Sequence, residues 1–449
     1  MRLLTVGLIL LVTLVASEAL AVATVMPKVE DDLGDLWLYG WVFSAFFLGN
    51  LVGLVVAGQA CDRMRPVVPF AIGLVLFMVG LVLGGLAGSM GMLVGARVLQ
   101  GMGAGALPAV AYVAIGRQYA PESRPRMFAL LSTAWVVPSV IGPGLAAVVG
   151  EHFGWRWVFL GLVPIVGACG VAVMGSVGHI PAPEAPLEEV SSLRDALLTA
   201  AGAGLTLAGL AESRLLLAIP LVVAGLAVLV PAFRRLTPPG TLRARRGLAA
   251  AVLIRGVLTF SFFQGDAYVP LSLTSIKGAS TFFAGVTLTA ASLTWTAGSW
   301  IQARRVTHDG PRPLVRVGFV SIAIGVVLMM VTLLDGVPIA LAIVAWSAAG
   351  LGIGLAYAPI SLTTLALAEP GREGSATASL QLSDVLGTAL GTGIGGVIIA
   401  TGQRQDWSLQ PTLLAIFAMS LAMSIVGVVL SSRLPRTIDG PAAVAPSTV

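Results

Sequence analysis

The sequence predicts an all-α polytopic membrane protein with fourteen transmembrane helices, arranged as two six-helix bundles and two linker helices. Its 449 residues are 57% hydrophobic and 10% charged, whereas soluble domains carry about 25% charged residues. Apolar stretches recur along the chain, and each is long enough to cross a hydrocarbon core of about 30 Å. Because no long stretch alternates in polarity, the backbone must satisfy its hydrogen bonds within helices.

The fourteen expected spans follow one another with short connections. The first starts after Arg2 and imitates a secretory signal, but its apolar run is longer than a typical signal, so we interpret it as an uncleaved span. The seventh is the shortest and turns sharply into the eighth at Ala211–Arg214. In order, the expected spans are 3–26, 37–58, 68–88, 92–115, 127–149, 157–178, 195–211, 215–233, 248–271, 281–302, 314–334, 337–367, 376–401 and 411–432.

The basic residues set the orientation. Of the 26 Lys and Arg residues, nineteen fall in the loops and tails on the side of the N-terminus and five on the opposite side, while Arg97 and Arg255 lie within spans. An excess of basic residues marks the cytoplasmic side, so both termini are expected in the cytoplasm. The net charge of +5 is therefore a consequence of topology and does not indicate nucleic-acid binding. Cys61 and Cys169 fall at or inside spans, which indicates neither a disulfide framework nor a metal site.

Internal repetition predicts the domain organisation. Short features recur at offsets of 247 or 249 residues: Asp62–Pro66 with Asp309–Pro313, Gly101–Gly105 with Gly350–Gly354, and Gly142 with Gly391. Two parallel halves of this kind place a substrate site between them near the bilayer midplane. The expected domains are an N-terminal bundle at 1–180, a linker with two additional helices at 181–246, a C-terminal bundle at 247–434 and a cytoplasmic tail at 435–449.

Glu18 and Arg97 are the first candidates for function, because each is a charge inside an expected span. An acid near a helix centre costs about 2.5 to 3.5 kcal/mol on insertion scales, so such residues are retained mainly where they act. Burial disfavours the ionised carboxylate, which makes Glu18 a candidate for binding and releasing a proton. A structural ion pair between Glu18 and Arg97 is the alternative, and the two interpretations are compatible.

Two further acids are candidates for proton coupling. Asp384 lies one turn before Gly387, on a ridge of small residues, and would be a second proton or cation site. Asp266 lies eleven residues after Arg255 and on the same helix face, and its alternative role is simply to reach the outer interface.

Aromatic and amide side chains on inward faces would form the pocket walls. Rings beside a few amides hold flat apolar cations by stacking and cation–π attraction, although each such residue is more often lipid-facing or packing. The candidates are Trp41, Phe43, Asn50, Gln100, Trp135, Gln264, Trp295, Trp346 and Gln381.

Several motifs resemble those of the major facilitator superfamily. "GQACDRMRP" resembles its loop motif G-x-x-x-D-R-x-G-R-K/R in Gly58, Asp62 and Arg63, although Arg65 and Pro66 replace the Gly-Arg pair. The resemblance implies that Asp62 pairs with arginines across the inner face and that this latch breaks when the protein opens inward.

Other motifs are similar to those of the fourteen-helix drug:proton antiporters. "RVLQGMGAG" is similar to the R-x-x-Q-G-x-G motif, with Arg97 and Gln100 in place, and "IGPGLAA" keeps Gly142 and Pro143 of the antiporter motif but has alanines for its last glycines. "WRWVFLGLVP" resembles the W-R-W-I-F-x-x-N-x-P segment with Leu in place of Asn. The spacing of Glu18 to Pro27 matches their first-helix motif, with Glu for the usual Asp.

The resemblance implies a multidrug exporter, a proton-coupled efflux antiporter of hydrophobic or cationic small molecules. It would be a monomer in the cytoplasmic membrane of a bacterium, driven by the proton gradient with no cofactor, metal or enzymatic activity. One alternative is a lipid or glycolipid exporter of the same fold, and a proton-coupled nutrient importer agrees less well with the antiporter motif. From other classes, a membrane enzyme is disfavoured because the three histidines lie at span ends or in loops, and a non-transporting receptor or scaffold stays open.

Overall fold

The computed structural model describes residues 2–61, 63–118, 136–181, 191–369 and 373–437, and the regular elements in these ranges are all helices. Ten of these helices are long and apolar enough to cross a membrane. The other four expected spans coincide with α1, α6, α9 and α12, and the first part of the fifth expected span lies outside the described residues. The all-α polytopic fold class is confirmed.

The helices are grouped in the order of the expected domains, whose boundaries stay a prediction. The N-terminal bundle consists of α1 (Arg2–Leu33), α2 (Tyr39–Cys61), α3 (Val67–Gly85), α4 (Met90–Gln118), α6 (Val136–His152), α7 (Arg156–Leu160) and α8 (Leu162–Val177). The linker carries α9 (Ser191–Ala211) and α10 (Leu215–Leu236). The C-terminal bundle consists of α11 (Leu248–Ser275), α12 (Thr281–Asp309), α13 (Pro311–Thr332), α14 (Leu341–Ala366), α15 (Glu373–Arg404) and α16 (Leu409–Leu430). Short 3-10 helices lie at Leu36–Leu38, Thr241–Arg243 and Ser431–Arg433.

The two bundles repeat the same close helix contacts. In the N-terminal bundle, a Cβ atom added to Gly101 of α4 would lie 2.0 Å from the carbonyl oxygen of Phe46 on α2. In the C-terminal bundle, a Cβ atom on Gly350 of α14 would lie 2.1 Å from the carbonyl oxygen of Ala291 on α12. Only glycine permits such backbone contact. The repeat read from the sequence therefore corresponds to equivalent packing in space.

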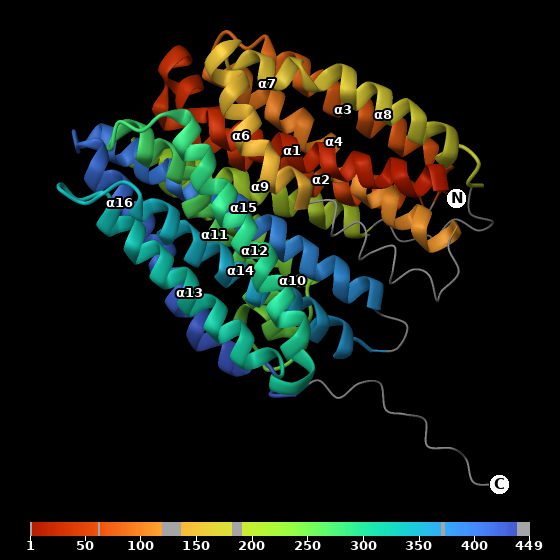
Figure 1. The fold of residues 1–449 in the computed structure, drawn as a ribbon. Coiled ribbons are helices and arrows are strands. Elements are labelled where there is room, and N and C mark those ends of the chain that lie inside the picture. The colour runs from red at the N-terminus through yellow and green to blue at the C-terminus, as the bar shows by residue number, and fades with distance from the viewer. Residues whose placement is uncertain (1, 62, 119–135, 182–190, 370–372, 438–449) are drawn as a thin grey trace.

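The bundles meet near the helix ends that lie away from the chain termini. A Cβ atom on Gly40 would lie 2.5 Å from the Cα atom of Gly396, which brings the start of α2 against the end of α15. A Cβ atom on Gly285 would lie 2.9 Å from the carbonyl oxygen of Pro143, which brings α12 against α6. Figure 1 shows the two bundles close together at this end, and their helices diverge toward the end where both termini lie.

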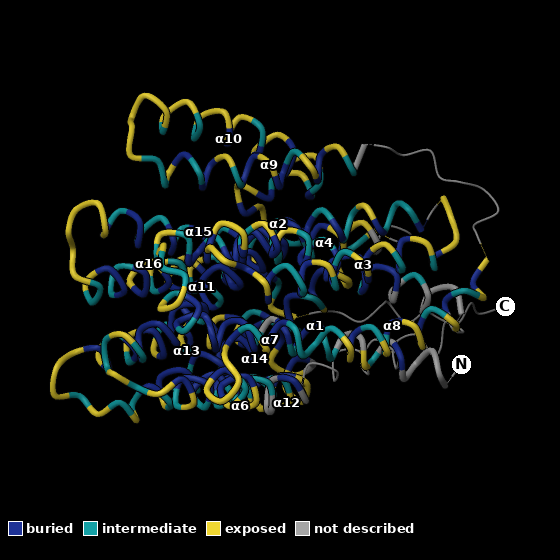
Figure 2. Tube along the Cα trace, turned by 90° about the horizontal axis from the view of Figure 1, so that it is seen from above, coloured by how far each residue is buried: buried dark blue, intermediate teal, exposed yellow. Residues whose placement is uncertain are grey.

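The linker helices lie along a seam between the bundles. Figure 2 shows α10 on the outside, with α9 between it and the remaining helices. Leu51 of α2, Ala203 of α9 and Leu382 of α15 belong to one buried apolar cluster, so α9 contacts both bundles. The outer face of α10 is apolar and exposed, with Leu216 at 90% exposure, as expected for a helix that faces lipid.

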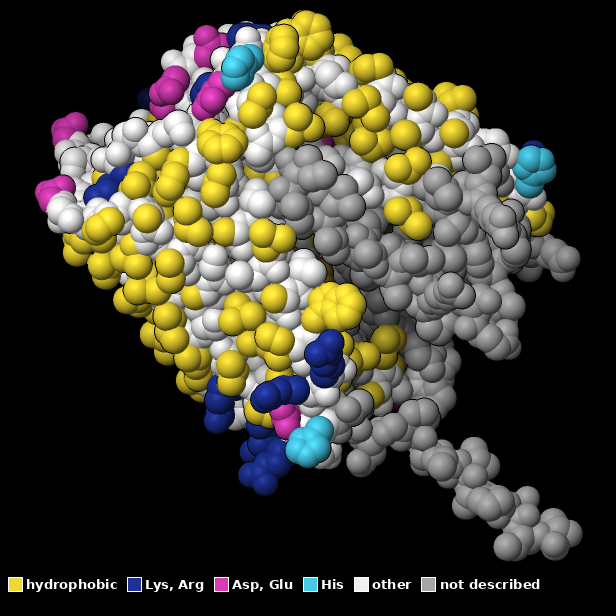
Figure 3. Space-filling model, in the orientation of Figure 1, with side chains coloured by type: hydrophobic (Ala, Val, Ile, Leu, Met, Phe, Trp, Pro, Cys, Tyr) yellow, Lys and Arg dark blue, Asp and Glu magenta, His cyan; other side chains and the backbone are white. Residues whose placement is uncertain are grey.

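The surface agrees with a membrane-embedded molecule. Figure 3 shows hydrophobic side chains over the middle of the visible face, whereas charged side chains gather toward its ends. This distribution is the one that a hydrocarbon layer between two aqueous phases selects.

Candidate proton and substrate sites

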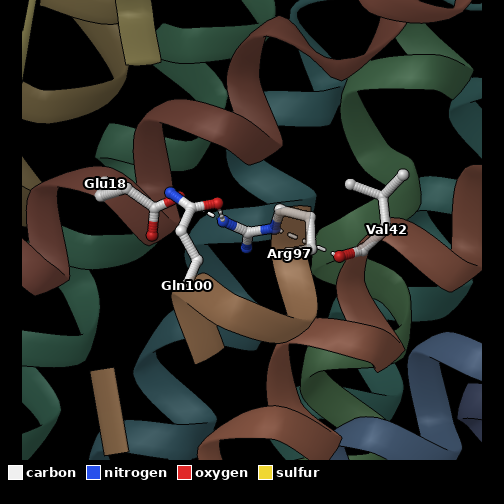
Figure 4. Close-up of polar contacts among 4 residues, drawn as sticks. All are labelled: Glu18, Val42, Arg97 and Gln100. Atoms are coloured by element: carbon white, nitrogen blue, oxygen red, sulfur yellow. Dashed lines mark hydrogen bonds and ion pairs between the residues drawn. The ribbon is translucent and has the colours of Figure 1, made fainter. Parts of the chain in front are cut away.

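Glu18 and Arg97 form a buried ion pair between α1 and α4 (Figure 4). Arg97 Nη1 donates to Glu18 Oε1 and also to Gln100 Oε1 at 3.0 Å, and Gln100 Nε2 donates to Glu18 Oε1 at 3.1 Å. Arg97 Nε donates to the carbonyl oxygen of Val42 on α2 at 3.2 Å. The exposed fractions are 1% for Glu18 and 2% for Arg97, so this network of three helices is shielded from solvent.

Local packing explains how these side chains meet. Gly101 lets α4 approach the backbone of α2. Arg97 lies one turn before Gly101, and Gln100 lies directly before it. The guanidinium of Arg97 also lies over the ring of Phe46, 4.1 Å from its centroid, and a cation at that distance is attracted by the ring face. The arginine is therefore held by a carboxylate, a carbonyl oxygen and an aromatic face.

One oxygen of the Glu18 carboxyl group has no partner. Oε1 accepts the hydrogen bonds described above, whereas Oε2 is buried and has no hydrogen-bond partner among the described residues. Buried polar atoms without partners are rare in folded proteins and often mark a functional group. This asymmetry leaves one oxygen available for a proton.

Asp266 occupies the position in the C-terminal bundle that Glu18 has in the N-terminal bundle. It lies 248 residues after Glu18, and Trp346 lies 249 residues after Arg97. Trp346 Nε1 donates to Asp266 Oδ1 at 2.8 Å, so a neutral indole replaces the guanidinium. The repeat offset could have revealed this equivalence in the sequence, but the partner of Asp266 was missed. Asp266 is bound to Trp346 and does not reach a charged partner among the described residues.

Asp384 is the third acid, and its partner was also missed by sequence reasoning. Tyr357 of α14 donates its hydroxyl hydrogen to Asp384 Oδ2 at 2.6 Å. Arg255 of α11 donates from Nη2 to the carbonyl oxygen of Tyr357 at 2.8 Å and to the hydroxyl of Ser361. No sequence motif singles out Tyr357 or Ser361. The structure thus places Arg255 near Asp384 and not beside Asp266.

The expected pocket residues divide between aromatic packing and polar positions. Trp295 contacts Phe262, Phe263 and Tyr357, and Trp346, which is fully buried, stacks on Phe262. Both polar atoms of the buried Gln264 amide have no hydrogen-bond partner among the described residues.

The other pocket candidates are spread along two helices. Phe43 is buried, and Trp41, Asn50 and Gln381 are half-buried. Trp135 lies outside the described residues. Gln381 lies one turn before Asp384 on α15, whereas Trp41, Phe43 and Asn50 lie on α2.

The expected gating residues lie at two places. Gly142 of α6 faces α1, where an added Cβ would be 3.9 Å from Leu20, and Pro143 contacts α12 of the other bundle. The antiporter-like motif therefore lies at a contact between the bundles. Gly58 is half-buried near the end of α2, Arg63 is exposed, and Asp62 lies outside the described residues.

The W-R-W segment ties together the end of the N-terminal bundle that lies away from the termini. Trp155 Nε1 and Arg156 Nη1 both donate to Asp32 Oδ2, at 3.1 and 2.7 Å. Two hydrogen bonds hold the pKa of Asp32 below its ordinary value: the one from Arg156 has the larger effect, and the one from Trp155 the next largest. This segment therefore has a structural role that fastens α1 to α7.

The helical fold and the buried Glu18–Arg97 site together define a polytopic membrane carrier. It has two equivalent helix bundles, and the buried charge pair lies inside one of them. The chain belongs to the Major Facilitator Superfamily, whose family model matches residues 7–392. Among the described residues, no group of three or more His, Cys, Asp or Glu side chains is placed to hold a metal ion.

Relatives with similar sequences are named as multidrug transporters. A probable multidrug-efflux transporter of Mycobacterium tuberculosis is 26% identical over 95% of this chain and 94% of its own length. The multidrug transporter protein MdtP of Bacillus subtilis is 26% identical over 95% of this chain and 81% of its own length. Multidrug resistance protein 3 of Bacillus subtilis is 33% identical, but this match spans only 35% of this chain and 31% of that protein.

Solved structures share the fold at low sequence identity. A POT family transporter in complex with 5-aminolevulinic acid has a TM-score of 0.71 and 13% identity, with 96% of each chain covered. A D-xylose-proton symporter has a TM-score of 0.69 and 14% identity, with 97% of this chain and 98% of that chain covered. These similarities concern the fold alone.

Proposed function

We propose that this protein is a proton-coupled efflux antiporter that exports hydrophobic or cationic small molecules by alternating access. The observation that carries the proposal is the buried Glu18–Arg97 pair, because an ionisable group inside a span is costly and typically belongs to a substrate or proton pathway. The names of the full-length relatives, which are multidrug transporters, support the substrate class.

Glu18 Oε2 is the atom on which a proton would travel, since it lacks a partner while Oε1 is fully engaged. Protonation removes the negative charge and weakens the attraction to Arg97. The contacts among α1, α2 and α4 then rest on hydrogen bonds to Gln100 and to the carbonyl oxygen of Val42. A change in one buried charge thus alters how firmly three helices of the N-terminal bundle hold one another.

Proton uptake from the outer side would favour opening toward the cytoplasm. Substrate binding between the bundles would displace the proton, and the loaded carrier would then turn outward. The contacts of Gly40 with Gly396 and of Gly285 with Pro143 support assignment of this conformation as closed on the outer side. Asp266 is a second candidate for proton transfer, because a neutral indole does not compensate an ionised carboxylate as a guanidinium does.

The proposed location is the cytoplasmic membrane of a bacterium, with both termini in the cytoplasm and the chain acting as a monomer. Exposed arginines at the ends of the helices near the termini support this orientation, among them Arg304, Arg305 and Arg316. The membrane potential and proton gradient across that membrane would supply the energy, with no cofactor.

Efflux of ethidium, a fluorescent lipophilic cation, from energised cells tests the proposal. Cells with the wild-type protein are expected to export the dye, and a protonophore is expected to stop export. Glu18→Gln keeps the shape of the side chain but cannot carry a proton, so export is expected to stop. Glu212→Gln, in the turn between α9 and α10, is the matched control that removes an acid outside the membrane and is expected to leave export unchanged. Equal dye retention by wild-type and Glu18→Gln cells, at equal expression, would refute the coupling role of Glu18.

A further inference from the structure

A tyrosine in the C-terminal bundle lies between a buried cation and an acid. The guanidinium carbon of Arg255 lies 3.5 Å from the centroid of the Tyr357 ring, and the Tyr357 hydroxyl donates to Asp384 Oδ2 at 2.6 Å. Arg255 is 1% exposed, whereas Tyr357 and Asp384 are half-buried. The acid is therefore more exposed than the cation.

The hydrogen bonds of Arg255 are incomplete. Nη2 donates to the carbonyl oxygen of Tyr357 and to the hydroxyl of Ser361, but Nε and Nη1 are buried with no hydrogen-bond partner among the described residues. A buried guanidinium is always charged and strongly favours a carboxylate partner. No ion pair to Arg255 occurs in the described part of the chain.

Asp384 is the acid linked to Arg255 through Tyr357, whose ring lies under the Arg255 guanidinium and whose hydroxyl donates to Asp384. The backbones of α11 and α15 are in close contact here, since an added Cβ on Gly387 would lie 2.2 Å from the carbonyl oxygen of Gly256. Side-chain rotation alone can therefore change the partner of Asp384. The unpartnered nitrogens of Arg255 are shielded from solvent, so the simplest partner for them comes from the protein itself.

We propose that Arg255 and the cationic group of a substrate compete for the Asp384 carboxylate, and that the Tyr357 hydroxyl holds this carboxylate in the position that receives the substrate. This inference rests on the proposed export of cationic molecules and assigns a binding site within it. With substrate bound, the carboxylate pairs with the substrate cation. After release, Arg255 turns to Asp384 and the two charges neutralise each other.

Binding of tetraphenylphosphonium to the purified full-length protein in lipid nanodiscs tests this competition. Tyr357→Phe keeps the ring under Arg255 but removes the hydroxyl, so Arg255 captures Asp384, and the affinity for the cation is expected to fall about tenfold or more. Arg255→Gln added to Tyr357→Phe removes the competitor, and the affinity is expected to return toward the wild-type value. Unchanged affinity in Tyr357→Phe, or no recovery in the double variant, would overturn the proposal.

Tyr268→Phe is the matched control. Its hydroxyl donates to the carbonyl oxygen of Thr392, also on α15, at 2.8 Å, so this variant loses an equivalent hydrogen bond to the same helix without touching Asp384. Its affinity for the cation is expected to equal that of the wild type. A similar loss in Tyr268→Phe would show that loosening α15 explains the effect, and would contradict the specific role of Tyr357.

Binding of tetraphenylborate, an anion of the same shape, distinguishes the proposed cation site from an anion site at Arg255. Loss of tetraphenylborate binding in Arg255→Gln, with tetraphenylphosphonium binding intact, would identify an anion site and overturn the competition. If the wild type binds no tetraphenylphosphonium, the proposed substrate class and this inference both fail. If the wild type binds it and Tyr357→Phe binds equally well, only this inference fails.

Discussion

The Glu18–Arg97 pair predicts a difference between two single substitutions that remove opposite charges. Arg97→Gln leaves the Glu18 carboxylate buried at 1% exposure without a cation. Glu18→Gln leaves the Arg97 guanidinium buried at 2% exposure without an anion. In both variants, one charge stays inside the bundle and has lost the partner that compensated it.

The expected cost is large for each single substitution. Removing one member of a buried ion pair destabilises a protein by about 3–5 kcal/mol, because the remaining charge is uncompensated. The double variant has no buried charge, and its amides can still bond with Gln100, so it is expected to be less destabilised than the sum of the singles. An interaction free energy of about 0.5–3 kcal/mol is typical for residues in contact.

The two singles are also expected to differ in their dependence on pH. In Arg97→Gln, the stranded carboxylate can take up a proton and become neutral, so the destabilisation is expected to shrink at pH 5 relative to pH 8. In Glu18→Gln, the guanidinium stays charged at both pH values and no carboxyl group remains at this position, so this site is expected to add no pH dependence to the variant's own free energy of unfolding.

Denaturant unfolding followed by tryptophan fluorescence in a fixed detergent measures the free energy of unfolding of the wild type, both singles and the double variant. Additive costs, or an identical pH dependence of the two singles, would refute the reasoning.

Three further predictions test packing and hydrogen bonding. Gly101→Ala places a Cβ 2.0 Å from a carbonyl oxygen of α2 and is expected to destabilise the protein by about 1–3 kcal/mol. Gly95→Ala, on the same helix but with no atom within 4 Å of the added Cβ, is expected to be neutral or to stabilise by up to about 1 kcal/mol. Thermal unfolding of the two variants tests this difference. Asp32→Asn is expected to lower the unfolding temperature at neutral pH, because the pKa of Asp32 is held low in the folded state. The difference in unfolding temperature between this variant and the wild type should vanish as the pH falls below about 4, where the wild-type carboxylate becomes protonated. Trp346→Phe leaves the Asp266 carboxyl group without its indole donor and is expected to cost about 1–3 kcal/mol, and combination with Asp266→Leu should recover part of that loss in the same unfolding measurement.

The sequence was sufficient for the fold class because hydropathy is a local property of each segment. Fourteen apolar stretches predicted the helices, and each coincides with helical structure in the described part of the chain, the fifth only over 136–149. The repeat offset also predicted which glycines make equivalent helix contacts, as Gly101 and Gly350 do. The boundaries of the domains stay a prediction.

The candidate acids were also visible in the sequence, because an acid inside an apolar run stands out by composition. Their partners were less accessible. Arg97 was identified as a partner for Glu18 because it too is a charge within a span, but Tyr357 is an ordinary residue of an apolar helix and carries no such signal. The roles of the residues in proton and substrate binding stay predictions.

The sequence by itself determined that this chain crosses a membrane many times, that its two halves repeat, and that a few acids lie among apolar neighbours. Only the tertiary structure decided which donor each acid meets: a guanidinium for Glu18, an indole for Asp266 and a phenol for Asp384. The physical reason is that the free energy of burying a span is a sum over its own residues. A hydrogen bond, in contrast, depends on a few tenths of an ångström between helices far apart in the chain, and the packing of the whole bundle sets that distance.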